Sequence, residues 1–285
     1  LLKNKKQGII LFITMTFLFI ISTTALILAE KSGNPLLAHA GLSQSMGNME
    51  GKETRFGIIG SALFSSVTTS FTTGSVNNMH DSLTPMGGFV TLWNMMLNVI
   101  FGGKGMGLVT ILLYAMLTVF ISGLMVGRTP EFLGKKLEEK EIKIICFSLL
   151  IHPILVLIPT AVSLIFKSDA VTNPGFHGLS QILYPFPTSS ANNGSGFEGL
   201  IDNTNYWNII TGITMFLGRY VLIILALWLS DSLRSKREVP ETEFTFRTDN
   251  LTFAVVLLFI ILVIGALTFL PVLALGPISE HLMIH

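Results

Sequence analysis

Five long runs of apolar residues divide the chain, separated by segments rich in charge, polar groups or glycine. A transmembrane helix needs about 20 predominantly apolar residues, because each residue advances the helix by only about 1.5 Å. The apolar runs cover residues 8–29, 88–126, 144–166, 206–229 and 251–270. This pattern predicts an all-α protein that crosses a membrane several times.

Two further segments are apolar but too short, and too rich in serine and threonine, to cross a bilayer. Residues 58–71 precede the uncharged turn TTGSVNN, and residues 178–190 precede the turn ANNGSG. Irregular backbone at membrane depth persists only where it is buried in protein or lines water. We therefore expect each segment to be a re-entrant pore helix followed by a polar turn inside the membrane.

The two short segments repeat each other at a distance of 120 positions, and a Trp-Asn pair follows each of them at the start of an apolar helix. The residues that are identical in this register include Leu63, Thr68, Gly74 and Ser75 in the first segment and Leu183, Thr188, Gly194 and Ser195 in the second. Repeated sequence indicates a repeated structural unit. We therefore predict two membrane–pore–membrane repeats.

The repeats define the expected domain organisation. The first spans residues 1–126, with its pore helix and turn at 58–78 and its second helix at 88–126. A loop at 127–143 leads to the second repeat at 144–232, with its pore helix and turn at 178–197. A second loop covers 233–250, and residues 251–285 form a terminal transmembrane helix and a short exterior tail that begins at Pro271.

The second helix of the first repeat contains the sequence FGGKGMG at residues 101–107. Glycine costs about 1 kcal/mol relative to alanine inside a helix, so four glycines around Lys104 should interrupt it. A surface loop between two helices is the alternative, but the part before the glycines is barely long enough to span alone. We expect a broken helix at membrane depth, since discontinuous helices are typical of ion and substrate pathways.

Composition agrees with a membrane protein. Half of the 285 residues are hydrophobic, 12% are charged, and the mean hydropathy is +0.67, which is far from the balance of a soluble domain. A net charge of +1 gives no basis for nucleic-acid binding. The single cysteine excludes a disulfide framework within the chain.

Basic residues gather on one side of the predicted topology. If the N-terminal edge is cytoplasmic, 12 of the 18 lysines and arginines are cytoplasmic and both polar turns face the exterior, as the positive-inside rule favours. These 12 residues are Lys3, Lys5, Lys6, Arg128, Lys135, Lys136, Lys140, Lys143, Arg234, Lys236, Arg237 and Arg247.

The polar turns have the residue types that suit a dehydrated monovalent cation. Such an ion needs several oxygen dipoles in place of its water, and inward-facing backbone carbonyls supply them without a full charge. Glycine allows backbone conformations that other residues rarely adopt. Residues 72–76 and 192–196 contain no Asp or Glu, which argues against a carboxylate site for a divalent cation.

Several motifs resemble those of one known family. They are SSVTTSFTTGSVNNMHDSLTPMGGFVTLWN, VFISGLMVGRTPEFLGKK, NPGFHGLSQILYPF, SSANNGSGFEGL, MFLGRYV and GALTFLPVLALGPISEHL. Together they resemble the potassium-binding, membrane-embedded subunit of the Kdp-type potassium-transporting ATPase, in the superfamily of potassium transporters with four membrane–pore–membrane repeats. The chain resembles the C-terminal half, so the resemblance implies an N-terminal half with two further filter segments.

The resemblance also assigns roles to residues. The potassium filter would contain Thr72, Thr73, Gly74 and Ser75 in the first repeat and Asn192, Asn193, Gly194 and Ser195 in the second. Many relatives carry Cys where Thr73 stands, so the side chain near the ion differs here. Potassium is the expected ion, and no organic cofactor is expected.

The family's charged residue beneath the filter falls on Arg219. A charge deep in an apolar span is costly unless it faces water or an acidic partner, so we expect Arg219 to act at the gate of the pore. The glycine break would contribute Gly102, Gly103, Lys104 and Gly105 to the same region. For Lys104, anchoring at the membrane interface is an equally good interpretation.

The chain has neither the phosphate-binding sequence GxxxxGK[ST] nor the DKTGT phosphorylation motif, so ATP hydrolysis is expected on another subunit. The resemblance implies a non-catalytic, multi-pass subunit of a bacterial cell membrane. It would bind exterior potassium and pass it inward to a P-type ATPase catalytic subunit, with two small accessory membrane subunits completing the complex.

Two other functions remain open. A passive Trk/Ktr-like potassium transporter would share the repeats and the broken helix, but not the Kdp-like motifs at residues 127–136 and at the C-terminal GPISEHL. A membrane enzyme would need a nucleophile beside an acid/base pair such as His80-Asp81. Hydrogen bonds that shape the mouth of the filter are the simpler role for that dipeptide.

Overall fold

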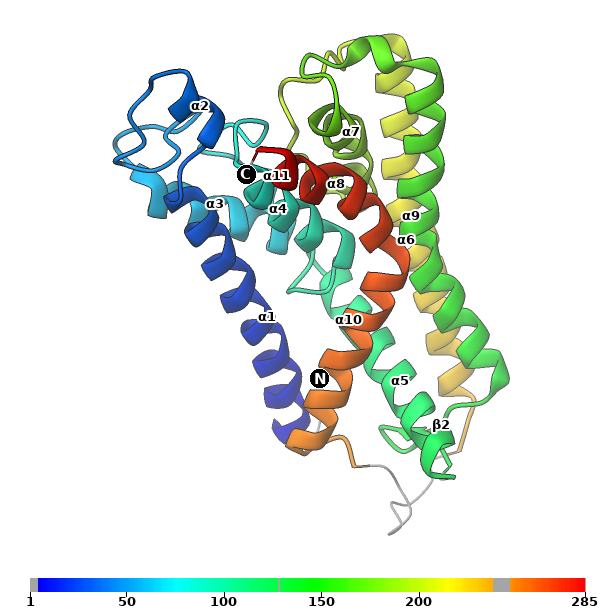
Figure 1. The fold of residues 1–285 in the computed structure, drawn as a ribbon. Coiled ribbons are helices and arrows are strands. Elements are labelled where there is room, and N and C mark those ends of the chain that lie inside the picture. The colour runs from blue at the N-terminus through cyan, green and yellow to red at the C-terminus, as the bar shows by residue number, and fades with distance from the viewer. Residues whose placement is uncertain (1–4, 128, 238–246, 285) are drawn as a thin grey trace.

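The computed structural model describes residues 5–127, 129–237 and 247–284. Its long helices run along roughly one direction (Figure 1). They are α1 (Lys5–Lys31), α5 (Met106–Val126), α6 (Glu139–Phe166), α9 (Asn205–Arg234) and α10 (Leu251–Leu273). In the described part of the chain, five helical stretches are long and apolar enough to cross a membrane. The predicted all-α polytopic membrane fold is confirmed.

The two short apolar segments also form helices. The first is α3 (Gly57–Phe71), and the second is divided into α7 (Phe176–Leu183) and α8 (Pro185–Ser190). Proline lacks a backbone N–H and suits the first position of a helix, which explains why α8 begins at Pro185. The remaining elements are α2 (Pro35–His39), α4 (Pro85–Leu97), β1 (Glu131–Phe132), β2 (Lys135–Lys136), η1 (Ser168–Ala170), η2 (Ala274–Ile278) and α11 (Ser279–Ile284).

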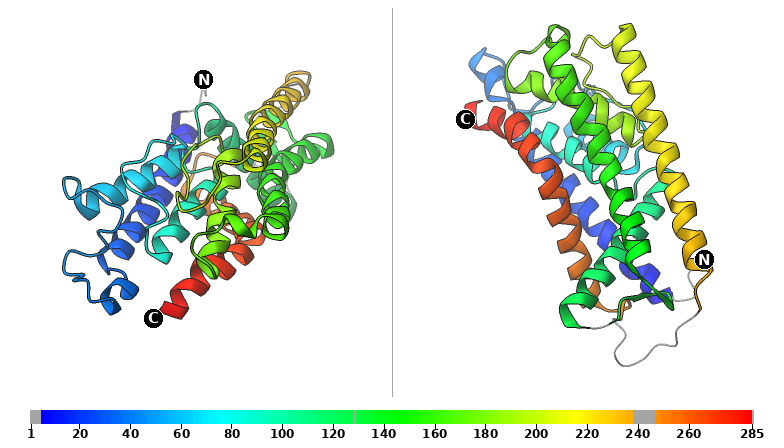
Figure 2. Two further views of the ribbon diagram at one scale, coloured as in Figure 1. Left: turned by 90° about the horizontal axis from the view of Figure 1, so that it is seen from above. Right: turned by 90° about the vertical axis from the view of Figure 1, so that its right-hand side faces the viewer.

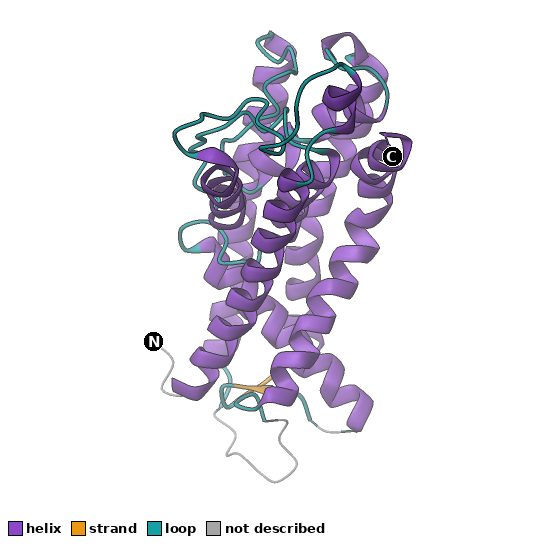
Figure 3. Ribbon diagram, turned by 60° about the vertical axis from the view of Figure 1, so that its left-hand side comes forward, coloured by secondary structure: helices purple, strands orange, loops and turns teal. Residues whose placement is uncertain are grey.

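Seen from above, α1 and α3 lie on one side of the molecule and α6 and α9 on the other, with α4 between them (Figure 2). The start of α1, the antiparallel β1–β2 hairpin, the end of α9 and the start of α10 lie at one end of the bundle (Figures 1 and 3). The opposite end carries α2, α7 and α11. Arg128 lies outside the described residues.

One lysine connects several segments at the end of the bundle that carries the β1–β2 hairpin. The Lys236 ammonium, just after α9, donates to Glu138 Oε2 at 2.9 Å, to the carboxylate of Glu141 and to the backbone oxygen of Lys136 at 3.0 Å. Lys135 Nζ donates in return to the backbone oxygen of Lys236 at 2.6 Å. These bonds join the end of α9 to the hairpin and to the first turn of α6.

Burial differs strongly between the long helices. In the most apolar part of α5, 61% of residues are buried, against 11% in α9. Large apolar side chains such as Ile209, Phe216 and Trp228 of α9 are exposed. Helix α5 is therefore central, whereas α9 presents apolar surface of the kind that lipid or further protein covers in a membrane.

Residues 30–57 are polar and contain several glycines and a proline, a composition that predicts an exposed loop, but the segment contains a buried ion pair. Lys52 Nζ lies 2.7 Å from Glu30 Oε2, and both side chains are fully buried. Glu30 also accepts hydrogen bonds from Asn48 Nδ2 at 2.9 Å and from the backbone N and Oγ1 of Thr84 at 2.9 and 2.7 Å. The prediction of exposure was wrong for these residues, because the loop folds back over the start of α4.

The prediction that the terminal helix ends before Pro271 is also wrong. Helix α10 continues through Pro271 to Leu273, followed by the π-helical turn η2 and by α11. A π turn is wider than an α turn, which accommodates the missing N–H and the bulky ring of Pro277. Ser279 Oγ donates to the carbonyl of Ala274 at 2.6 Å. The chain end thus stays helical and reaches α7.

Candidate ion-binding turns

The two polar turns have matching backbone conformations. Thr72, which caps the C-terminus of α3, lies in the left-handed region with φ of 49°, and Gly74 has φ of 79°. In the second turn Asn192 has φ of 55° and Gly194 has φ of 112°. These positions are the pairs that the 120-residue offset aligns. Side chains disfavour such conformations, which explains glycine at positions 74 and 194.

The hydrogen bonds within the turns match as well. The backbone N–H of Thr73 donates to the carbonyl of Thr68 at 3.1 Å, and that of Asn193 donates to the carbonyl of Thr188 at 2.8 Å. The Thr188 hydroxyl also accepts from the N–H of Gly194 at 3.0 Å. Helices α3 and α8 are therefore each followed by a turn that is closed by a carbonyl from the last turn of the helix.

The two turns contact each other directly. A Cβ atom built on Gly74 would lie 2.3 Å from the backbone oxygen of Asn193 and 3.3 Å from the Cα of Gly194. Asn193 Nδ2 donates to the carbonyl of Thr68 at 2.7 Å. The structure therefore brings together the residues that the sequence singles out in each repeat, 120 positions apart.

Neutral oxygen atoms dominate these turns. Thr73, Ser75 and Gly194 are exposed, whereas Ser195 and Asn193 are buried. The Thr72 hydroxyl is buried and has no hydrogen-bond partner among the described residues. No group of three or more His, Cys, Asp or Glu side chains in the described part of the chain could hold a metal ion. The oxygen donors here are those that suit a monovalent cation.

The glycine break contacts both turns and the C-terminal end of α3. Residues 98–105 separate α4 from α5. Gly102 donates its N–H to the carbonyl of Ser70 at 3.0 Å. A Cβ on Gly103 would lie 2.5 Å from Thr72 Oγ1 and 3.8 Å from the carbonyl oxygen of Ala191. Gly105, with φ of 78°, is the N-cap residue of α5, and Lys104 is exposed.

Arg219 lies half-buried in the middle of α9, next to the second turn. The preceding residue, Gly218, packs so closely that a Cβ would lie 2.4 Å from the carbonyl oxygen of Ser190. Among the described residues no carboxylate lies within ion-pair distance of Arg219. Water or protein beyond these residues must solvate its charge.

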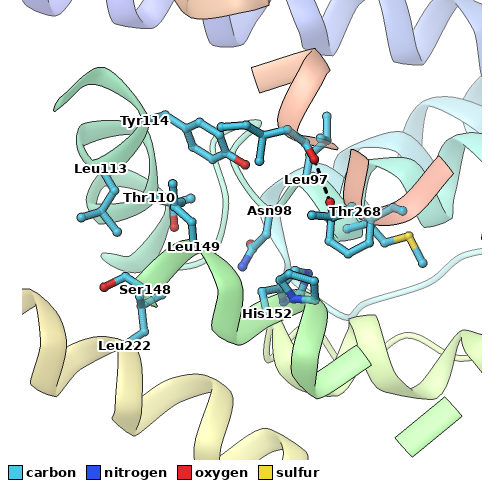
Figure 4. A pocket seen from close by; sticks show the side chains of 14 residues that line it. Leu97, Asn98, Thr110, Leu113, Tyr114, Ser148, Leu149, His152, Leu222 and Thr268 are labelled. Atoms are coloured by element: carbon cyan, nitrogen blue, oxygen red, sulfur yellow. Dashed lines mark hydrogen bonds between the residues drawn. The ribbon is translucent and has the colours of Figure 1, made fainter. Parts of the chain in front are cut away.

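A cavity of about 40 Å³ lies between α4, α5, α6, α9 and α10 (Figure 4). Its polar lining includes Asn98, Tyr114, Ser148 and Thr268, and the Asn98 side-chain oxygen is buried without a partner in the described chain. Leu222 of α9, three residues after Arg219, also lines the cavity. Such a polar cavity has room for water.

His152 connects this cavity to helix α8. Its Nδ1 lies 2.8 Å from Ser190 Oγ, and its Nε2 lies 3.1 Å from the carbonyl oxygen of Met95. In the sequence the dipeptide His152-Pro153 suggests only a kink in an apolar helix. The sequence did carry a sign of these contacts, because an ionisable residue within a membrane span usually pairs with another polar group.

A charged cluster at the opposite end from the hairpin joins three distant segments. His177 Nε2 lies 3.1 Å from Asp81 Oδ1, and His177 Nδ1 lies 2.9 Å from Glu280 Oε1. Gln181 Nε2 donates to Asp81 Oδ1 at 2.9 Å. Burial lowers the pKa of His177, but hydrogen bonds to both carboxylates and their charges outweigh it and raise the pKa to about 9. His177 is therefore a cation at neutral pH.

This cluster predicts a pH-dependent stability. Since the pKa of His177 rises from 6.5 to about 9 on folding, its stabilising effect is complete below about pH 6.5 and is lost as the pH passes 9. We expect His177→Ala to reduce the free energy of unfolding by on the order of 2 kcal/mol at pH 7 and by much less at pH 10. Thermal unfolding of the detergent-solubilised protein measures this.

His39→Ala, which removes an exposed histidine of α2, is the control for this measurement. Equal losses of stability in His177→Ala at both pH values would contradict a stabilising role of the ion pairs.

Comparison with known proteins identifies the family to which the chain belongs. The family model of the potassium-transporting ATPase A subunit, KdpA, matches residues 1–282. The potassium-transporting ATPase potassium-binding subunit of Geobacillus kaustophilus is 58% identical over 284 residues, which cover 99% of this chain and 51% of that protein. The subunit of the same name from Clostridium acetobutylicum is 62% identical over 256 residues, covering 89% and 46%.

The chain thus spans about half the length of the curated relatives it matches. Since the family model covers nearly all of the 285 residues, the chain belongs to the family of potassium-transporting ATPase A subunits.

Proposed function

We propose that this chain forms part of the potassium-binding subunit of an ATP-driven potassium uptake complex, with the ion bound between its two glycine turns and oxygen atoms supplied by the rest of the subunit. The observation that carries the proposal is the direct contact of two turns with matching left-handed backbones at Thr72, Gly74, Asn192 and Gly194. Closely apposed turns of this kind can present several backbone carbonyls to one ion.

The chemistry of the turns favours potassium over a divalent ion. Their residues carry hydroxyl, amide and carbonyl oxygens but no carboxylate. A large monovalent cation exchanges its water for such dipoles at little cost, whereas calcium or magnesium requires charged ligands. The names of the two relatives also state potassium binding.

A path inward from the turns would pass the glycine break. Gly103 lies directly against Thr72, so a shift of the break would open or close the space below the first turn. The polar cavity beside Asn98 lies next to this break, and Arg219 lies one helical turn from the cavity residue Leu222. In this proposal Arg219 and the residues Gly102–Gly105 form the gate, where a fixed positive charge opposes the uncontrolled passage of cations.

The proposed partners are a P-type ATPase catalytic subunit, two small accessory membrane subunits and an N-terminal half with two further filter segments, in a bacterial cell membrane. The names of the family and of its relatives, which are potassium-transporting ATPase subunits, support an ATPase complex. Uptake that requires both ATP and the co-expressed pump subunit would distinguish this function from a passive Trk/Ktr-like transporter.

The enzyme alternative has little support. The Asp81 carboxylate bonds His177 and Gln181, so it does not orient the ring of His80 as an acid/base pair requires. Turnover of a substrate by the isolated chain would nevertheless favour that alternative.

The proposal is tested by the potassium-stimulated ATPase activity of the full complex with Gly194→Asp. Gly194 has φ of 112°, and only the Cα of Gly74, at 3.8 Å, lies near a built Cβ. The variant should therefore assemble but distort the turn. We expect the potassium concentration for half-maximal activity to rise by about tenfold or more, equivalent to about 1.4 kcal/mol, with the maximal rate retained.

Gly196→Asp is the matched control, because it adds the same charge where φ is ordinary and no atom lies within 4 Å of the built Cβ. An unchanged potassium titration in an assembled Gly194→Asp complex would contradict the filter assignment. An equal shift in both variants would indicate a general effect of charge.

A further inference from the structure

His80 lies just beyond the first turn, and the second repeat holds it at two points. Its ring is fully buried, and Nδ1 shares a hydrogen bond of 2.8 Å with the hydroxyl of Tyr184. Its backbone N–H donates to Glu198 Oε2 at 3.1 Å. Tyr184 precedes the second turn and Glu198 follows it, so His80 is tied to both sides of that turn.

Tyr184 also bonds a residue of the second turn. Its hydroxyl lies 3.0 Å from Ser195 Oγ, and Ser195 directly follows Gly194. The backbone N–H of Ser195 donates to Asn193 Oδ1 at 2.9 Å, and Asn193 Nδ2 donates to the carbonyl of Thr68 in the first pore helix at 2.7 Å. These hydrogen bonds form a circuit through His80, Tyr184, Ser195, Asn193 and Thr68. The circuit begins and ends in the first repeat, at His80 and Thr68.

We propose that His80 and Tyr184 are positioning residues for ion selection: their hydrogen bond fixes Ser195 and so holds the second turn at a set distance from the first. This inference rests on the proposed role of the turns in binding potassium. The spacing of the oxygen atoms decides which alkali cation replaces its water at least cost. A tether between the turns therefore affects discrimination between ions of different size.

Two features keep the hydrogen bond between His80 and Tyr184 constant. Burial, and to a lesser degree the charge of Lys52, lowers the pKa of His80 to about 4, so the ring stays neutral and its bond to Tyr184 is the same throughout the physiological pH range. The ring of Tyr184 is fully buried and stacks on Phe197 with 4.2 Å between centroids. Packing holds the ring, and the hydroxyl makes the connection.

The test is Tyr184→Phe in the full complex, which removes the hydroxyl and leaves the ring packing. Potassium and rubidium titrations of ATPase activity give the ratio of their half-maximal concentrations. Loss of a buried hydrogen bond is expected to change this ratio by about threefold to tenfold, with the maximal rate and the melting temperature near those of the parent.

Tyr206→Phe is the matched control, because it removes a hydroxyl that bonds Ser163 between α9 and α6 at 3.0 Å, outside the circuit. It should leave the ratio unchanged. The side chain of His80→Asn can still bond the Tyr184 hydroxyl, so this variant should retain most of the selectivity that His80→Leu loses.

An ion ratio in Tyr184→Phe equal to that in Tyr206→Phe would overturn the inference. If Tyr184→Phe has no effect but Gly194→Asp shifts the potassium titration, the filter assignment is supported and only the positioning role of Tyr184 fails. If neither Tyr184→Phe nor Gly194→Asp has an effect, the proposed function itself fails.

Discussion

Gly74→Ala is expected to abolish potassium-stimulated activity at low potassium and to raise the half-maximal potassium concentration by more than tenfold. The new methyl group would lie 2.3 Å from the backbone oxygen of Asn193 and 3.1 Å from its carbonyl carbon. Because both contacts are to backbone, no side chain can move away. The φ of 79° adds strain, since a residue with a Cβ disfavours this conformation.

The measurement is a potassium titration of ATPase activity in the assembled complex, alongside Gly196→Ala. Gly196 lies in the second turn, but a Cβ there would meet no atom within 4 Å and its φ is ordinary. We expect Gly196→Ala to behave like the parent. A normal titration in Gly74→Ala would show that the two turns do not have to touch for potassium to bind.

Glu30→Ala is expected to produce the largest loss of stability, about 3–5 kcal/mol, because it leaves the Lys52 ammonium buried without its counter-ion. The Glu30 carboxylate accepts hydrogen bonds from Asn48 and Thr84 and pairs with Lys52 at 2.7 Å. Thr84 is the N-cap of α4. The loss should therefore loosen the junction between α1, the following loop and the start of α4.

Thermal unfolding of the solubilised protein measures this effect, with Glu53→Ala as the control. Glu53 belongs to the same loop and pairs with Arg55, but both side chains are exposed, and exposed pairs contribute only about 0–1 kcal/mol. The double variant Glu30→Ala/Lys52→Met should recover part of the loss, because it removes the unpaired charge. No recovery would indicate that the hydrogen bonds to Thr84 and Asn48 dominate.

The positions of the main elements could be predicted because their causes are local. A run of about 20 apolar residues suffices for a membrane helix. Four of the five predicted runs lie within α1, α6, α9 and α10, and the fifth, 88–126, is divided between α4 and α5. Glycine among polar, uncharged residues likewise indicates an unusual turn, and Gly74 and Gly194 both have positive φ. The interruption of the helix at residues 98–105 follows from the same property of glycine.

Pro271 shows where local reasoning fails. Proline commonly ends a helix, yet α10 continues past it and leads through the π turn to α11. The ion pair between Glu280 and His177 and the packing of η2 on α7 give the helical end a partner that the local sequence does not reveal.

The apolar helices, the two glycine turns and the break at residues 98–105 are predictable from the amino-acid sequence, since length, hydropathy and glycine act on the backbone nearby. Three contacts between distant segments depend instead on how the helices pack. Gly74 touches Asn193, His177 joins Asp81 to Glu280 across 96 and 103 positions, and Tyr184 links His80 to Ser195. A membrane helix is apolar on nearly all sides, so its sequence does not mark the face that meets a neighbour. Packing selects that face, and polar groups then pair wherever packing excludes water.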